Sequence, residues 1–344
     1  MLLAKYEGVE MAWRMLGALA LLLTMAGAGQ GAAAATGYRV LDRIPGPDGG
    51  WDYVRIDAQA DRVLVTRGGS VMAVDLATGK VAAGLAPGAR LHTALPVNGG
   101  TEVLVTNGGG DAAVFFDAKT WTQVASTPTG KGPDSATLDL RSGLVLVMDH
   151  AGGEVTLIDP KRHTAVGTIE VGGALEEAAA DGAGKAFVNV EDRNQIAVLD
   201  LDTRQVTARY PLTGCDGPTG LAYDAADRLL IVACDGATDL MDARDGAVVQ
   251  TLPTGKGADG AAFDPRRRLA FIPAGRDGTL AVIAIAHGRG RIVETVPTRI
   301  SARTIGLDER TGRLYLPSAQ YVVTPGGGRP GMEPGSFQLL VVGK

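Results

Sequence analysis

The feature that most constrains this chain is an internal repeat of about 42 residues. Short Val-rich segments end in an aspartate at steps of 41 or 42 residues, at Asp75, Asp117, Asp159, Asp200 and Asp242. An earlier segment of each unit ends in a second marker, which occurs seven times: Asp57, Asn98, Asp139, Asp181, Asp224, Asp264 and Asp308. Seven markers indicate seven structural units, because a fixed period of this length is the signature of a repeat architecture.

Each unit contains four short segments rich in aliphatic residues, separated by Gly, Asp, Asn or Pro. In the third unit they span 136–139, 144–148, 154–158 and 165–170. Four strands in about 40 residues is typical of a propeller blade. The sequence therefore predicts an all-β fold, a seven-bladed β-propeller with four antiparallel strands per blade. The 49 glycines and the 5% of aromatic residues fit such a turn-rich protein, and we interpret the recurring aspartates as turn residues.

The last unit contains only three predicted strands. The segment Tyr38–Ile44 resembles the fourth strands predicted at 248–252 and 292–296. We expect this N-terminal strand to complete the last blade and close the ring, which removes free sheet edges that would otherwise pair with other chains. Residues 36–344 are therefore predicted to form a single domain.

The N-terminal segment has the pattern of an export signal. An apolar run begins at Met15, directly after Arg14, and leads to small residues that end in Ala33-Ala34-Ala35, an A-x-A cleavage pattern. Charged residues before Met11 are unusual in a signal peptide, so we expect Met11 to be the true start. Residues 1–35 are predicted to be cleaved, which leaves a periplasmic or secreted protein without a membrane anchor. The alternative is an uncleaved anchor, since the segment is long enough to span a bilayer.

Composition and cysteine content restrict the partners and the chemistry. The net charge is −5, and no run of Lys and Arg forms a stripe, so nucleic acid is not expected as the main partner. The two cysteines, Cys215 and Cys234, form no C-x-x-C pair. Cys215 precedes one predicted strand and Cys234 ends the next. These two strands are antiparallel around a turn at 224–227, so the cysteines should meet at the same end. We predict a disulfide, which export permits; a redox role is the alternative.

The repeat unit resembles that of the YVTN-repeat (YncE-like) β-propeller family. The resemblance covers the predicted mature chain and rests on the strand ending in Val-x-Asp before Thr-Gly, on Gly217–Asp224 and on Gly331–Phe337. The sixth unit departs from the pattern at 283–286, and the second lacks the Gly-Pro turn. The resemblance implies the propeller fold but assigns no activity, because one fold carries many functions. Similar propellers occur in exported redox systems, so it also implies a role as an accessory subunit of a periplasmic redox enzyme.

One face of the expected propeller collects most of the chemistry-bearing side chains. Loops that enter the first strand of each blade share this funnel face with loops that join the second and third strands. The candidate ligand or metal residues there are Asp52, His92, Asp134, Asp149, His150, Glu176, Glu191, Asp259, Arg276 and Arg303. A ring of carboxylates suits Ca²⁺, and histidine with Asp or Glu suits Zn²⁺. A divalent cation is thus the one candidate cofactor, and an ordinary polar surface is the alternative. His163 and His287 are expected to be surface residues on the opposite side.

One predicted loop on the funnel face is unusually long. It runs from Ser318 to Ser336 and contains Gly326-Gly-Gly-Arg-Pro330. Loops of this length in a compact domain are usually functional or disordered. We interpret it as a lid over the channel mouth, with a plain surface loop as the alternative.

The chain has no G-x-S-x-G nucleophile motif and no haem, nucleotide or zinc signature. The leading hypothesis is therefore a monomeric binding or scaffold protein, which presents its funnel face to a small molecule or a periplasmic protein partner. A metal-assisted hydrolase of lactonase type, using the Asp/Glu/His ring, is the first alternative. The accessory subunit of a redox enzyme is the second.

Overall fold

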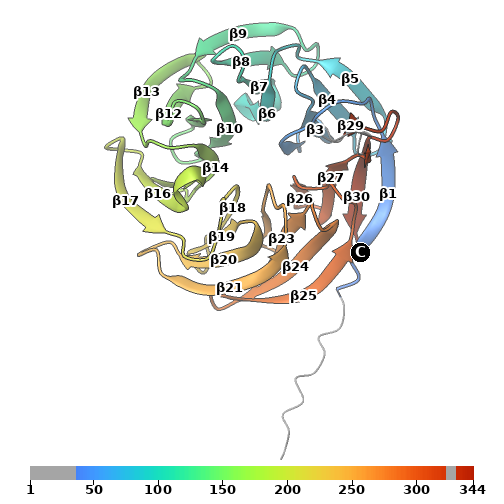
Figure 1. Cartoon of the computed structure of the whole chain (residues 1–344). Coiled ribbons are helices and arrows are strands. Elements are labelled where there is room, and N and C mark those ends of the chain that lie inside the picture. Colours follow the sequence, from blue (N-terminus) through green and yellow to red (C-terminus); the bar gives the residue numbers. More distant parts are fainter. Residues whose placement is uncertain (1–35, 323–330) are drawn as a thin grey trace, which may run out of the picture. The chain divides into compact units, whose positions relative to one another are not determined.

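The computed structural model describes residues 36–322 and 331–344. In this part of the chain, seven four-stranded antiparallel sheets are arranged as blades around a central channel, as predicted (Figure 1). The only helices among the described residues are two 3-10 turns, η1 (Asn98–Gly100) and η2 (Glu191–Arg193). None of the described helices is long and apolar enough to cross a membrane.

The strands of each blade follow one another from the channel outward. Blade 1 contains β2 Val54–Asp57, β3 Arg62–Thr66, β4 Val71–Asp75 and β5 Val81–Leu85. Blade 2 contains β6 Leu91–Val97, β7 Glu102–Asn107, β8 Ala112–Asp117 and β9 Gln123–Pro128. Blade 3 contains β10 Pro133–Leu138, β11 Val145–Asp149, β12 Glu154–Asp159 and β13 Thr164–Glu170. Blade 4 contains β14 Leu175–Ala180, β15 Lys185–Val190, β16 Gln195–Asp200 and β17 Gln205–Pro211. Blade 5 contains β18 Gly220–Asp224, β19 Leu229–Ala233, β20 Gly236–Asp242 and β21 Val248–Gly255. Blade 6 contains β22 Ala262–Asp264, β23 Leu269–Ala274, β24 Thr279–Ala286 and β25 Arg289–Pro297. Blade 7 contains β26 Gly306–Asp308, β27 Arg313–Ser318, β30 Gln338–Gly343 and β1 Arg39–Pro45.

The hydrophobic core lies between neighbouring blades. Phe187 and Val198 of blade 4, for example, belong to one buried cluster with Leu230 of blade 5. The middle strands are covered on both faces, so their apolar residues form continuous runs rather than alternating with polar ones. The outermost strands are mostly exposed, as in β13.

The N-terminal strand closes the ring, as predicted. β1 pairs antiparallel with β30, from Arg39 opposite Gly343 to Pro45 opposite Gln338. Tyr38, just before β1, is buried and its ring packs 5.1 Å from that of Phe271 in blade 6. Both ends of the described chain are thus joined in the last blade.

The recurring aspartates form the expected turns. Asp75 Oδ1 accepts hydrogen bonds from the backbone N–H of Ala77 and Thr78, at 3.1 and 2.7 Å, and its backbone oxygen accepts from Gly79 N, whose φ of +70° suits glycine. The disulfide is also confirmed: Cys215 and Cys234 are buried and bonded, with their Cα atoms 5.3 Å apart.

One of the two expectations for the remaining histidines is wrong. His163 is not a plain surface residue, because its Nε2 lies 2.9 Å from Glu102 Oε2 and its ring packs 4.5 Å from that of Phe115. His287 is exposed, as expected. The long loop, Ser318–Ser336, contains a small hairpin of β28 (Tyr321–Val322) and β29 (Gly331–Met332). Its centre, 323–330, and the expected signal peptide, 1–35, lie outside the described residues.

Candidate binding site at the channel mouth

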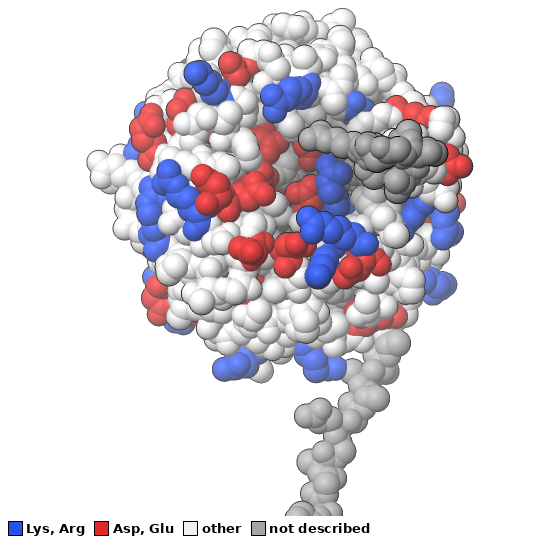
Figure 2. Space-filling model, viewed as in Figure 1, with Lys and Arg blue, Asp and Glu red and all other residues white. Residues whose placement is uncertain are grey.

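Charged side chains meet at the channel mouth because they occupy the same position of the repeat. Asp52, Asp134, Glu176, Asp259 and Arg303 each stand five residues before the marker that ends the innermost strand of their blade. Blades are related by rotation about the channel, so equivalent positions lie at one level around it. Figure 2 shows acidic side chains gathered around the centre of this face, with basic ones among them.

Three neighbouring blades carry a β-bulge at this level. The pairing register of β6, β10 and β14 shifts between Leu91 and Ala94, between Pro133 and Ala136, and between Leu175 and Ala178. The bulged residues are His92-Thr93, Asp134-Ser135 and Glu176-Glu177. Bulges bend a strand and redirect its side chains, and they are frequent beside functional sites. Here they bring the polar side chains of three adjacent blades to one place.

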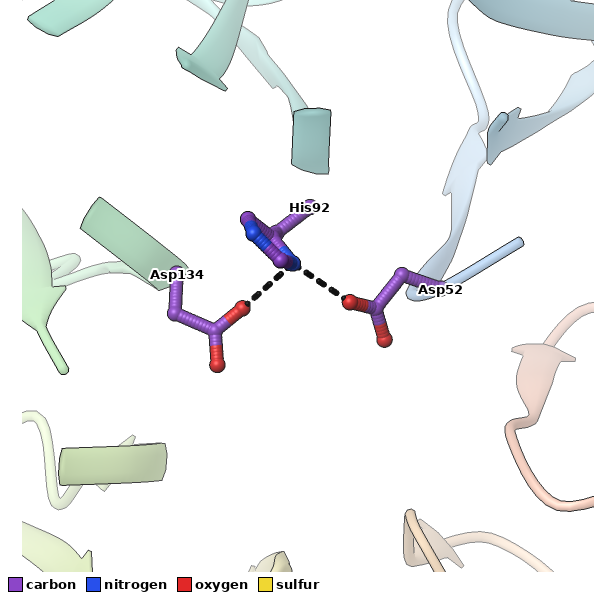
Figure 3. Close-up of side chains that lie close together, drawn as sticks. All are labelled: Asp52, His92 and Asp134. Atoms are coloured by element: carbon purple, nitrogen blue, oxygen red, sulfur yellow. Dashed lines mark hydrogen bonds and ion pairs between the residues drawn. The ribbon is translucent and has the colours of Figure 1, made fainter. Parts of the chain in front are cut away.

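His92 stands between two carboxylates (Figure 3). Its Nδ1 lies 2.6 Å from Asp52 Oδ2 of blade 1 and 3.0 Å from Asp134 Oδ1 of blade 3. Burial opposes protonation of the ring, but the carboxylates of Asp134 and Asp52 close to Nδ1 outweigh it and raise the pKa of His92. Burial also raises the pKa of Asp52, against the effect of His92.

A second histidine, His150, lies near Asp134 and pairs with a carboxylate of blade 4. His150 Nδ1 lies 3.0 Å from Glu176 Oε1 and 3.1 Å from the backbone oxygen of Leu175. The hydroxyl of Tyr53 donates to the second oxygen of Glu176, at 3.3 Å. The hydrogen bond to Glu176 raises the pKa of His150, and burial raises the pKa of Glu176. Asp134 is near enough to both histidines for two possible ligand sets, Asp52-His92-Asp134 and Asp134-His150-Glu176.

Two further carboxylates of the channel mouth have arginine partners. Glu177 Oε1 lies 3.2 Å from Arg55 Nη2, and Asp259 Oδ2 lies 2.5 Å from Arg303 Nε. Burial raises the pKa of Glu177 and of Asp259, and the paired arginines oppose this effect. These pairs are electrically neutral, whereas Asp52, Asp134 and Glu176 have only the two histidines as close cationic partners among the described residues.

Two pockets open beside this network and share Asp259 and Arg303. The smaller, of about 240 Å³, is lined by Asp52, Arg90, His92, Gly132, Asp134, His150, Ala151, Glu176, Asp259 and Arg303. The larger, of about 580 Å³, lies over blades 4 to 7 and is lined by Glu191, Asp216, Gly217, Thr219, Asp235, Gly257, Ala258, Asp259, Gly275, Arg276, Ile300, Ser301 and Arg303.

The structure therefore brings nine of the ten sequence candidates to these two pockets. Asp149 is the exception: it is fully buried, and its Oδ2 accepts a hydrogen bond from Thr156 Oγ1 at 2.6 Å. Consecutive side chains of a strand point to opposite sides, so Asp149 in β11 faces the sheet packing while His150, beyond the strand end, reaches the channel. The candidates omit Tyr53 and Arg55, which lie one and three residues after Asp52; the signal was their place at the start of the innermost strand.

Comparison with known proteins supports the fold and nothing finer. No protein-family model matches the chain, and no curated protein matches it in sequence. A chain of the Kuenenia stuttgartiensis hydrazine synthase structure is similar with a TM-score of 0.68 and 15% identity, over 83% of this chain and 95% of that one. A chain of a crystal structure of the mitotic checkpoint complex is similar with a TM-score of 0.68 and 13% identity, over 92% and 95%. At such identities the likeness shows a seven-bladed β-propeller, a scaffold with many functions.

Proposed function

We propose that this chain is an exported binding protein that takes a small, positively charged organic ligand at the funnel face. The observation that carries the proposal is an excess of carboxylates around the two adjoining pockets. The fold is compatible with a binding or scaffold role, and propellers generally use such concave faces for recognition. A pocket with a few convergent charged groups and shifted pKa values is the ordinary place for a ligand.

The lining of the larger pocket contains acidic side chains that no cationic side chain in the described part of the chain neutralises. Its arginines already have partners, because Arg276 Nη1 lies 2.9 Å from Asp235 Oδ2 and Arg303 is paired with Asp259. Asp216 accepts only a neutral donor, the Asn194 amide at 2.7 Å. Glu191, the remaining acidic residue of the lining, has no ion-pair partner among the described residues. Carboxylates without cationic partners favour an ammonium group on the ligand.

The floor of the larger pocket favours an apolar body beside that charge. Ala258 and Ile300 and the backbone of Gly217, Gly257 and Gly275 line it. Backbone without side chains lets a ligand approach closely. An amine with a short hydrocarbon chain therefore matches both the charge and the surface.

Export and the family assignment belong to the same proposal. The N-terminal pattern favours a periplasmic or secreted protein, and the disulfide is compatible with an oxidising compartment. The repeat resembles the YVTN-repeat family, and we propose membership in it. We expect a monomer, because closure of the last blade by β1 leaves only the short outer edge of each blade unpaired.

The binding proposal is tested by calorimetric titration of residues 36–344 with cadaverine and with glutarate, a diamine and a dicarboxylate of matching carbon chain. Cadaverine should bind, and Glu191→Gln with Asp216→Asn should weaken it by about tenfold or more, since a hydrogen bond to a charged group contributes about 1.5–3 kcal/mol. Asp245→Asn, on an exposed turn between β20 and β21, is the matched control. Equal binding of both ligands, or of neither, contradicts the proposal.

A metal-assisted hydrolase of lactonase type is the second candidate, favoured by the histidines and carboxylates that line the smaller pocket. A metal there would polarise a carbonyl or activate water. Lactone hydrolysis that needs a divalent ion and is lost in His92→Gln would support this function. A role as accessory subunit of a redox enzyme stays a prediction from resemblance, and no residue contact described above bears on it.

A further inference from the structure

We propose that Asp52, His92 and Asp134 hold one divalent transition-metal ion of the Zn²⁺ type at the channel mouth. The inference rests on the proposed function in one respect, since the ion would form part of the same cation-binding face. The bound species is an inorganic ion, and its three protein ligands come from three neighbouring blades. Five observations carry it: proton count, an orphaned oxygen, charge, positioning and donor chemistry.

The single hydrogen on His92 Nδ1 cannot form a full hydrogen bond with both neighbouring carboxylates. Nδ1 lies 2.6 Å from Asp52 Oδ2 and 3.0 Å from Asp134 Oδ1. An imidazole nitrogen carries at most one hydrogen. The hydrogen that Nδ1 donates to Asp52 is therefore not available to Asp134. A metal ion in place of this proton would be bound by the nitrogen and by both carboxylates together.

Asp134 carries the orphaned oxygen. The residue is only 9% exposed, and its Oδ1, which points at His92, is buried without a hydrogen-bond donor. A buried carboxylate oxygen left unpaired costs free energy, more than a neutral group does. A ligand that this oxygen binds would remove that cost.

The local charge also matches a divalent ion. Arg55 and Arg303 are committed to Glu177 and Asp259. The carboxylates left over are Asp52, Asp134 and Glu176. With both imidazoles neutral, as metal binding requires, these three are opposed in the smaller pocket only by the exposed guanidinium of Arg90. Three carboxylates and one guanidinium leave a net charge of −2, which one divalent ion would neutralise.

The three ligands are positioned by a repeated backbone device. In each of them the backbone oxygen accepts a hydrogen bond from a threonine hydroxyl of the preceding blade. Thr304 Oγ1 holds Asp52 at 3.0 Å, Thr66 Oγ1 holds His92 at 2.6 Å, and Thr106 Oγ1 holds Asp134 at 2.7 Å. Supporting hydrogen bonds of this kind hold a metal site in place before the metal arrives.

The donor set selects the metal. One imidazole nitrogen with two carboxylate oxygens suits Zn²⁺ and related ions, whereas Ca²⁺ prefers six or more oxygens. All three residues line the smaller pocket of about 240 Å³. A fourth coordination position would therefore face that pocket and take water or a ligand group.

The test is calorimetric titration of residues 36–344 with ZnCl₂ after treatment with EDTA, with metal content measured by mass spectrometry. The wild type should bind one Zn²⁺ per chain and should bind Ca²⁺ much more weakly. Asp134→Asn and His92→Gln should weaken Zn²⁺ binding by more than the roughly 10- to 100-fold that loss of an outer-shell partner costs. Circular dichroism in EDTA establishes that each variant is folded.

Two control variants keep the test specific. His163→Gln removes a histidine with one carboxylate partner, Glu102, far from the channel in the fold, and should bind Zn²⁺ like the wild type. His150→Gln should also keep the ion. Failure of the wild type to bind Zn²⁺ stoichiometrically, unchanged affinity in Asp134→Asn, or loss of affinity in His150→Gln equal to that in His92→Gln overturns the assignment.

The two proposals fail separately. Cadaverine binding that depends on Glu191, together with Zn²⁺ affinity that does not depend on Asp134, overturns only the metal site. Zn²⁺ binding as described, without any binding of cadaverine, overturns only the organic ligand.

Discussion

Asp149 is a fully buried carboxylate whose ionisation should lower the stability of the fold. It lies directly opposite Glu154 in the hairpin of β11 and β12. Its Oδ2 accepts from Thr156 Oγ1 at 2.6 Å, but its Oδ1 is buried without a partner. Burial, with Glu154 adding to it, raises the pKa of Asp149 from 3.8 to about 7. Replacing this side chain by its uncharged isostere, Asp149→Asn, isolates the effect.

The sign follows from the two pKa values. The unfolded chain releases the proton near pH 3.8, whereas the folded protein holds it until about pH 7. Between these values the unfolded state binds fewer protons, so the free energy of unfolding of the wild type falls as pH rises. At about 1.4 kcal/mol per pKa unit, the full loss is on the order of 4 kcal/mol. Asp149→Asn escapes this loss, but burial of its amide costs about 1–3 kcal/mol at every pH.

The measurement is urea unfolding of both proteins from about pH 5 to about pH 8, with free energies extrapolated to zero urea. The free energy of unfolding of the variant, relative to that of the wild type, should rise by roughly 3 kcal/mol across this range. The rise should follow the titration curve of Asp149. The other carboxylates are present in both proteins, so the difference reports Asp149 together with its interaction with Glu154.

The control variant has the opposite sign. Hydrogen bonds from the Thr78 side chain and backbone lower the pKa of Asp75, so its contribution to stability is present above the unfolded pKa and is lost as pH falls. Asp75→Asn should therefore be less stable against unfolding than the wild type at neutral pH and equally stable in acid. A stability difference between Asp149→Asn and the wild type that does not change with pH would refute the reasoning.

Three further perturbations test the architecture. Cys215→Ser with Cys234→Ser should lower the free energy of unfolding by about 3 kcal/mol, because the disulfide closes a loop with a sequence separation of 19; equal urea midpoints would contradict this. Deletion of residues 36–45 removes β1 and exposes the edge of β30, and should cost at least about 3 kcal/mol and cause self-association in light scattering; a stable monomer would disprove closure by this strand. Gly220→Ala should destabilise by about 3 kcal/mol or more, since the new Cβ would lie 2.3 Å from the Gly260 carbonyl carbon in the next blade; an unchanged melting temperature would speak against such close packing.

The repeat made most of the fold predictable. Aspartates spaced by 41 or 42 residues mark turns whose chemistry is local, because Asp75 bonds backbone N–H groups only two and three residues ahead. A period containing four strand-like segments leaves few other architectures. The similarity of Tyr38–Ile44 to the missing fourth strand was sufficient to predict closure of the ring, which β1 confirms.

The candidate site was predictable only as a set of positions. Sequence reasoning placed Asp52, His92 and Asp134 on one face, but three residues some 40 positions apart become neighbours only when the blades close around the channel. The bulges in β6, β10 and β14 decide which of two consecutive side chains faces the channel. Such bulges shift pairing by one residue and leave no reliable sequence signal.

His163 and Asp149 show the same boundary between sequence and structure. Both occupy positions of the repeat that suggested a simple role, a surface residue and a funnel-face ligand. Contacts with Glu102 in one case and with Thr156 in the other decided otherwise. The sequence by itself determined the seven blades, their turns and their closure, because these depend on local chemistry repeated at a fixed period. Only the tertiary structure decided which charges meet, because burial and ion pairing depend on distances between blades that no single repeat contains.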